Sequence, residues 1–388
     1  MAGSVMEIAQ CRGARRDERP YSLQPLHYGN RCAFFKMEKK TPQAIQPSPV
    51  SQFVRIFSFL CLLALWIPNA LADPVSELAS FSVFDKVDLA ALAKGDPNVA
   101  HGTPMGGRYI SAQSCFVVAA PPMRVAEAMR QWNPARHSDL KVLLHSDLSS
   151  SPGPANFSRL SSAPDNGAVR FLVSATQKLS TDLQISKEEA KKLPAANMGS
   201  GAMPAPIAGF WADVLSSRAR AFSSGGSAAQ PPYDHTEQAV RPSEEFNGLL
   251  RQQDKIRRQF SGLIDSSGIG RGSGSLRPEL FWELLTADEQ GVLTLGASYR
   301  RSGPNGTYQA ADALYYASGG YYVGLTLYQM WPVDIGGRPS TLVWRGDFIS
   351  SATIASLHGI ERVASESAMM RDISKAITAF RRDMGGGR

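Results

Sequence analysis

Along the C-terminal third of the chain, apolar and aromatic residues gather in short runs separated by turn signals. Runs of this composition are typical of strands in a pleated sheet, and short breaks rich in Gly or Asp are typical of hairpin turns. Breaks at 287–290, 318–320 and 336–337 therefore predict consecutive antiparallel strands. The predicted strands are residues 280–286, 291–300, 308–317, 321–333 and 340–351.

The last apolar pattern of the chain has the period of a helix. Apolar residues recur every seven positions along two neighbouring rows, and charged residues lie elsewhere. The rows are Val363, Met370, Ile377 and Met384, and beside them Ile373 and Phe380. A stripe of this kind must bury against other apolar surface. We therefore predict a helix at 360–384, roughly 37 Å long, that packs across the sheet.

Upstream of the sheet the pattern is mixed. Alternation predicts a strand at 108–118, which Pro121 and Pro122 end, and a helix follows at 123–132. Residues 169–175 are a further strand candidate. Helices are predicted at 186–193, 207–222 and 243–263, with a flexible Ser/Gly/Pro linker at 223–234. The whole pattern predicts an α+β fold: an antiparallel curved sheet packed on a long C-terminal helix, with a helical insertion at about 206–264.

An apolar run of twelve residues lies near the start of the chain, at 56–67, after Arg55 and before the Ala-x-Ala exit that ends at Ala72. This is the pattern of a secretory signal peptide, and the run is shorter than the roughly 20 residues that span a membrane. We expect a signal peptide over 37–72, a secreted or periplasmic protein, and no stable transmembrane span after cleavage. An uncleaved anchor or a buried helix is the alternative.

The leader and the periodic elements together define the expected organisation of the chain. Residues 1–36 are polar and aperiodic, so we interpret them as a disordered extension, or as untranslated sequence with Met37 as the true start. Residues 73–107 form a lead-in segment. Residues 108–384 are then expected to form a single α+β domain.

Charge and cysteine usage narrow the classes of function. Lys and Arg exceed Asp and Glu by 41 to 34, but by nine to four within 1–72, which leaves 32 against 30 in the remainder. The remainder therefore lacks the basic surface that nucleic-acid binding requires, and we expect no nucleic-acid partner. Three of the four cysteines precede residue 73. Cys115 is then left alone in a strand, where it is expected to pack as a small apolar side chain.

In order and pattern, the chain resembles the START-like or polyketide-cyclase-like helix-grip superfamily. Three places carry the resemblance: FVVAAPPMRV at 116–125, the paired runs 321–333 and 341–351, and the closing helix 360–384. The two added helices and the linker within 207–263 depart from the family pattern. The resemblance implies a curved sheet that holds a hydrophobic ligand, such as a lipid, against the long helix.

The residue chemistry of the predicted sheet offers candidate ligand contacts. Both faces of 321–331 are largely apolar, so one face can take the helix while the other lines a pocket. Arg345 and Asp347 share a face and can present an ion pair beside an aromatic ring. The alternative is that this pair is solvated and that the aromatic residues are core. The candidate ligand-binding residues are Tyr315, Tyr328, Trp331, Trp344, Arg345 and Asp347.

No catalytic signature stands out in the sequence. The Gly-x-Ser-x-Gly and His-Glu-x-x-His motifs are absent, and the histidines lack the spacing of zinc ligands, so we expect no metal and no cofactor. The leading hypothesis is an exported binding module for a hydrophobic small molecule or lipid. A second is a non-enzymatic structural or interaction protein of the cell envelope, whose protein partners the sequence does not identify. A cyclase-type or hydrolase-type enzyme is a weaker third, because no residue stands out as acid, base or nucleophile.

Overall fold

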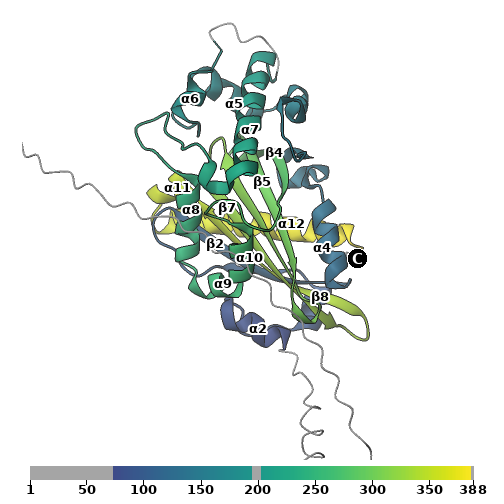
Figure 1. Cartoon of the computed structure of the whole chain (residues 1–388). Coiled ribbons are helices and arrows are strands. Elements are labelled where there is room, and N and C mark those ends of the chain that lie inside the picture. Colours follow the sequence, from purple (N-terminus) through teal and green to yellow (C-terminus); the bar gives the residue numbers. More distant parts are fainter. Residues whose placement is uncertain (1–72, 195–201, 386–388) are drawn as a thin grey trace, which may run out of the picture. The chain divides into compact units, whose positions relative to one another are not determined.

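Eight antiparallel strands form one curved sheet in the order β1-β2-β8-β7-β6-β5-β4-β3 (Figure 1). The computed structural model describes residues 73–194 and 202–385, so the predicted signal peptide and the extension before it lie outside the described residues. The strands are β1 (Asn98–His101), β2 (Tyr109–Val118), β3 (Val142–Asp147), β4 (Glu279–Ala287), β5 (Gln290–Ser302), β6 (Tyr308–Ala317), β7 (Val323–Asp334) and β8 (Pro339–Ser350).

The predicted hairpins of the C-terminal third are confirmed. β4 pairs with β5 around Asp288 and Glu289, which both have positive φ, as the tight turn between paired strands requires. Glycines with positive φ make the next turns, Gly320 between β6 and β7, and Gly336 and Gly337 between β7 and β8. The predicted upstream strand is also present, and as β2 it pairs along its whole length with β8.

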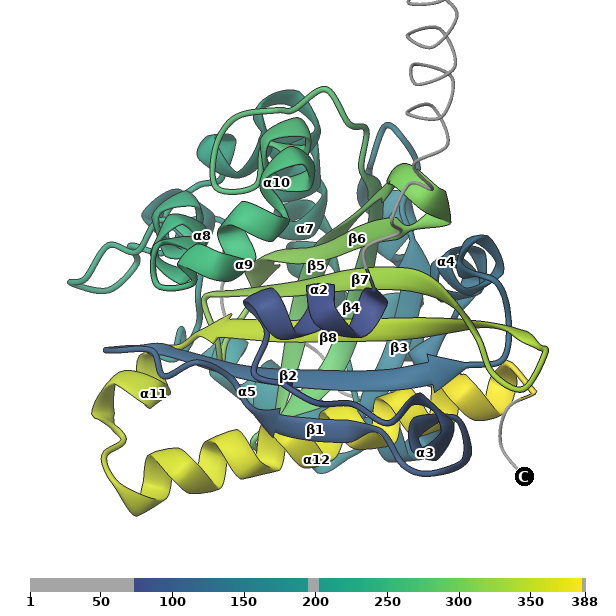
Figure 2. The same cartoon turned by 90° about the horizontal axis from the view of Figure 1, so that it is seen from below.

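One face of the sheet, called here the α12 face, packs against helices α4 (Pro122–Gln131) and α12 (Ile360–Asp383). Figure 2 shows α12 crossing the strands on the side opposite α2 (Pro74–Phe81). Of the predicted apolar stripe, Ile373, Ile377 and Phe380 are buried against the sheet. The first residue of the stripe is not buried. The side chain of Val363 is 53% exposed, where the helix runs beyond the sheet.

The opposite face, called here the α7 face, is covered by helices from the segment between β3 and β4, together with α2 (Figure 1). This segment runs through η3 (Pro154–Ser162), α5 (Gly167–Gln177), α6 (Lys187–Ala190), α7 (Ala205–Gly225), η4 (Gly226–Ala229), α8 (Pro242–Arg251), α9 (Asp254–Gln259) and α10 (Ser261–Ser267). Short elements complete the fold: α3 (Leu89–Lys94), η1 (Pro134–Arg136), η2 (Ser138–Leu140), η5 (Pro304–Gly306) and α11 (Ala352–Ser356).

Two predictions on this face were wrong. Residues 169–175 form part of helix α5, because Asn166 caps the first turn and Val169 and Leu172 fall on one helical face that packs on the sheet. The long helix expected at 243–263 is three helices, which meet near Gln253 and Phe260. At 169–175 the alternation extends over too few residues to distinguish a strand from a helix.

Residues 223–234, predicted as a flexible linker, are ordered by the side chain of Arg218. This guanidinium is fully buried and donates to Glu189 Oε2 at 2.6 Å and to the carbonyl of Pro231 at 3.0 Å. It also lies 4.4 Å from the ring centre of Tyr316 and 5.3 Å from that of Tyr233. The ion pair therefore ties α6, α7 and the following loop to one another over the α7 face.

Candidate functional site

A cavity of about 290 Å³ lies on the α12 face, between the sheet and helices α4 and α12. Its volume is close to the lower end of the range for small-molecule sites. The helices contribute an apolar wall, and the sheet contributes most of the polar and charged side chains. The apolar wall consists of Ala126, Met129, Ala376, Ile377 and Phe380.

The sheet side of the cavity is organised by strand register. Glu279, Ser298, Asp312, Thr326 and Asp347 are paired one with the next across β4, β5, β6, β7 and β8. Residues paired in register project from the same face of a sheet, so these five form one polar row. A second row lies two residues away from the first on each strand, and it contains Arg300, Ala310, Tyr328 and Arg345. The sheet itself thus places five acidic or basic groups beneath the cavity.

Asp312 is the central member of the polar row. The hydroxyl of Ser298 donates to its Oδ1 at 2.5 Å, and within 73–194 and 202–385 no basic side chain forms an ion pair with it. Burial raises the pKa of Asp312, and the Ser298 hydrogen bond and the charges of Arg300 and Arg345 offset this only in part. The carboxyl group lines the cavity and is partly accessible from it.

Arg345 lies two strands away from Asp312 and is held by another carboxylate. Its Nε and Nη2 donate to the two oxygens of Asp347 at 2.8 and 2.6 Å, and Thr326 donates to the same carboxylate at 3.0 Å. Burial disfavours the guanidinium charge, but the Asp347 carboxylate outweighs it and raises the pKa of Arg345. The guanidinium also lies 5.6 Å from the ring centre of Tyr328, so its position is fixed from two sides.

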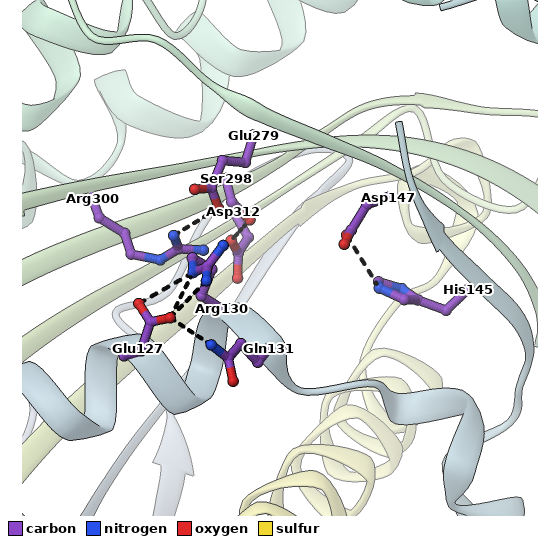
Figure 3. A network of polar contacts seen from close by, with 9 residues as sticks. All are labelled: Glu127, Arg130, Gln131, His145, Asp147, Glu279, Ser298, Arg300 and Asp312. Atoms are coloured by element: carbon purple, nitrogen blue, oxygen red, sulfur yellow. Dashed lines mark hydrogen bonds and ion pairs between the residues drawn. The ribbon is translucent and has the colours of Figure 1, made fainter. Parts of the chain in front are cut away.

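Two ion pairs lie where the cavity meets solvent (Figure 3). On α4, Arg130 is paired with Glu127, at 2.6 Å from Nη2 to Oε1, and on the sheet Arg300 donates to Glu279 at 2.7 Å. The figure shows the α4 and sheet side chains pointing toward one another. These partly exposed pairs contribute little to stability, but they surround the entrance with charge of both signs.

The far side of the cavity is formed by β3 and β4. His145 Nδ1 lies 3.0 Å from Glu283 Oε1, and its Nε2 lies 3.9 Å from Asp147. The ring of Phe281 lies against Gly296, because any Cβ at that position would stand 2.1 Å from the ring. Gly296 therefore allows this aromatic side chain to lie close to β5 and leaves the space above it open.

The six sequence-predicted ligand contacts divide between the two faces. Tyr328 and Arg345 line the cavity, and Asp347 lies beneath it as the partner of Arg345. The expected Arg345–Asp347 pair is present beside an aromatic ring, and it is largely buried rather than solvated.

The other three predicted contacts belong to the core of the α7 face, opposite the cavity. Tyr315 stacks on Phe222 with 3.8 Å between ring centres. Trp344 donates to Gln113 at 3.1 Å, and Trp331 packs near Phe81. Successive side chains of a strand point to opposite faces of the sheet, so Tyr328 lies on the α12 face and these three aromatic residues lie on the α7 face.

Several cavity residues were missed by the sequence interpretation: Asp312, Ser298, Glu283, His145 and Phe281. A signal was present for Asp312. Alternate residues of β6 on this side of the sheet read Tyr308, Ala310, Asp312 and Leu314, so one carboxylate interrupts an otherwise apolar face. The other four required knowledge of which strands lie next to each other.

Within the part of the chain that the structure describes, no group of three or more His, Cys, Asp or Glu side chains is arranged to hold a metal ion. None of the helices in the described ranges has both the length and the apolarity needed to cross a membrane. The sequence matches no protein-family model and no curated protein.

Proposed function

We propose that this protein binds a small organic molecule with an apolar body in the cavity between the sheet and helices α4 and α12. The observation that carries the proposal is the cavity itself, about 290 Å³, which lies between the sheet and two packed helices. Its wall from α4 and α12 is apolar, and its sheet side offers a few fixed polar groups. That combination is typical of sites for small molecules.

The proposal includes membership of the START-like helix-grip superfamily. It is supported by the order of elements after the short edge strand β1: strand β2, helix α4, strand β3, then β4 to β8 and the closing helix α12. It is also supported by the pairing of β2 with the last strand, β8. The helices inserted between β3 and β4 lie on the face away from the cavity, so they leave the proposed binding site intact.

Filling the cavity tests the proposed function. Ala310 lines the cavity and is buried, and the variant Ala310→Leu would place an isobutyl group in the space that a ligand occupies. Small apolar probes such as indole should raise the melting temperature of the wild-type full chain in proportion to their occupancy, because a ligand of the folded state stabilises it. The variant should lose this response while remaining folded by circular dichroism.

The matched control is Ala364→Leu, the same substitution at an exposed position of α12. It should respond to indole as the wild type does. Binding that persists unchanged in Ala310→Leu would show that the probe sits elsewhere. Native mass spectrometry of the protein purified from its own cells then identifies a bound molecule by the mass difference.

Export is a further part of the proposal. It is supported by the leader pattern at 37–72 in the sequence, which ends one residue before Asp73, the residue that caps helix α2. Amino-terminal sequencing of the protein isolated from the periplasm or culture medium should find Asp73 first. A cytoplasmic protein that retains the leader would rule export out.

A further inference from the structure

The charged groups around the cavity indicate which chemical class of ligand it can bind. Six carboxylates and three guanidiniums stand in or directly behind the cavity, so negative charge is in excess among the described residues. The groups that face this space come from α4 (Glu127, Arg130), β3 (His145, Asp147), β4 (Glu279, Glu283), β5 (Arg300), β6 (Asp312), β7 (Tyr328) and β8 (Arg345, Asp347). The cavity-lining residues of α12 carry no charge.

Each guanidinium already has a carboxylate partner. Arg130 pairs with Glu127, Arg300 with Glu279, and Arg345 with both oxygens of Asp347. Each guanidinium keeps N–H groups that no carboxylate holds, but its charge is already balanced by a protein carboxylate, which weakens its attraction for a ligand anion. The arginines are therefore poorly placed to recognise an acidic ligand, although they line the cavity.

Asp312 is in the opposite situation. The hydroxyl of Ser298 donates to it, and the hydroxyl of Tyr328 lies within hydrogen-bonding reach, so its close partners are neutral. Among the described residues no guanidinium forms an ion pair with it, because Arg300 is held by Glu279 and Arg345 by Asp347. Burying a carboxylate without a cationic partner costs free energy, and such groups are found mainly at functional sites. The Asp312 carboxylate lies on the sheet side of the cavity, opposite the apolar wall from α4 and α12.

We infer that the ligand is a small organic cation, with an ammonium group that pairs with Asp312 and an apolar body that lies against α4 and α12. The inference rests on the proposed function, because it concerns the same cavity. Tyr328, paired in register with Ala310, also lines the cavity and offers its ring to the apolar body of the ligand. Phe281 and Phe380 lie on the walls of the cavity and suit an aromatic or aliphatic body.

The acid–base state of Asp312 agrees with this role. Burial raises the pKa of Asp312. A bound ammonium group would favour the charged carboxylate and so lower that pKa. Preference for a cation should weaken as the pH falls through the pKa of Asp312.

Three probes of nearly equal size and shape test the inference: tryptamine, tryptophol and indole-3-acetate, which are cationic, neutral and anionic. We expect isothermal titration of the full chain to give tryptamine an affinity on the order of tenfold above tryptophol, with indole-3-acetate weakest. Asp312→Asn should bring the tryptamine and tryptophol affinities together. Asp213→Asn, on an exposed position of α7, is the control and should leave the ratio unchanged.

The outcomes separate the inference from the proposed function. If tryptophol binds as tightly as tryptamine, or indole-3-acetate binds tightest, the cation is ruled out while the cavity remains the site. If no probe binds, or binding survives Ala310→Leu, the proposed function fails and the inference fails with it. Should Asp312→Asn not fold, the pH dependence of the tryptamine-to-tryptophol ratio in the wild type decides, and a ratio that does not fall at acid pH overturns the inference.

Discussion

Replacing Arg218 with methionine should cost the domain a large part of its stability, although the residue is far from the proposed binding site. The substitution keeps the length of the side chain and removes its charge. It would leave the Glu189 carboxylate buried with no cationic partner, at a position where Arg218 is fully enclosed. Breaking one side of a buried ion pair costs about 3 to 5 kcal/mol, and the contacts of the guanidinium with two tyrosine rings add to the loss.

We expect Arg218→Met to lower the free energy of unfolding by about 4 kcal/mol. At roughly 2 °C for each kcal/mol in a domain of this size, the melting temperature should fall by about 8 °C. Glu189→Gln should cost a similar amount, since it leaves the guanidinium unpaired. The double variant Arg218→Met with Glu189→Leu should recover much of the loss, because neither charge is then left buried. The double variant should not recover all of it, because Glu189→Leu removes the acceptor of the hydrogen bond from Ser186 N–H.

Urea unfolding of the full chain, followed by circular dichroism, measures these differences as shifts in midpoint at constant slope. The control is Lys191→Met, which removes an ion pair with Glu188 of which both side chains are at least 70% exposed. This pair should be worth less than about 1 kcal/mol. Single variants that cost no more than the control, or a double variant whose cost equals the sum of the singles, would refute the account.

Two further predictions concern titratable groups away from the cavity. Burial raises the pKa of the Cys115 thiol to about 12, so Cys115 should resist a thiol reagent at mildly alkaline pH in the folded protein and react after unfolding, as peptide mapping can show. Burial alone would raise the pKa of Asp383, but hydrogen bonds from Trp132 and His137 outweigh it and lower that pKa. The stabilisation from Asp383 is then complete above its unfolded pKa of about 4 and is lost as the pH falls through the folded pKa. Asp383→Asn should therefore destabilise the protein at neutral pH and match the wild type in acid; equal destabilisation at both pH values would contradict this.

The sheet could be predicted from the sequence because its signals are local. Each hairpin of the C-terminal third has an aromatic run on either side of a Gly-containing or Asp-containing break. The helix at 360–384 was equally clear, because its period persists through three repeats. Residues 169–175 were mistaken for a strand because seven residues rich in Val and Leu fit both periods.

The binding site was less accessible to sequence reasoning. Tyr328 and Arg345 were named because their strands, β7 and β8, have a distinctive alternation, but Tyr315 and Trp344 were named with them although they face the other way. Which face holds the cavity depends on where α4, α12 and the inserted helices settle. No pattern within a single strand contains that information. The neighbours of Asp312 come from strands adjacent in space, and their register becomes visible only in the folded sheet.

The pairing of β2 with β8 also determines when this domain can fold. Gln113 and Trp344, which are joined by a hydrogen bond across these strands, are separated by 231 residues of chain. Until β8 has been synthesised, β2 lacks the partner on its inner edge and β7 lacks one of its two neighbours. Contacts of such long range make folding slow and leave the nascent chain without its complete sheet until the last tenth of it emerges. A chain that stays unfolded this long can still pass through an export channel, which agrees with the export proposed above.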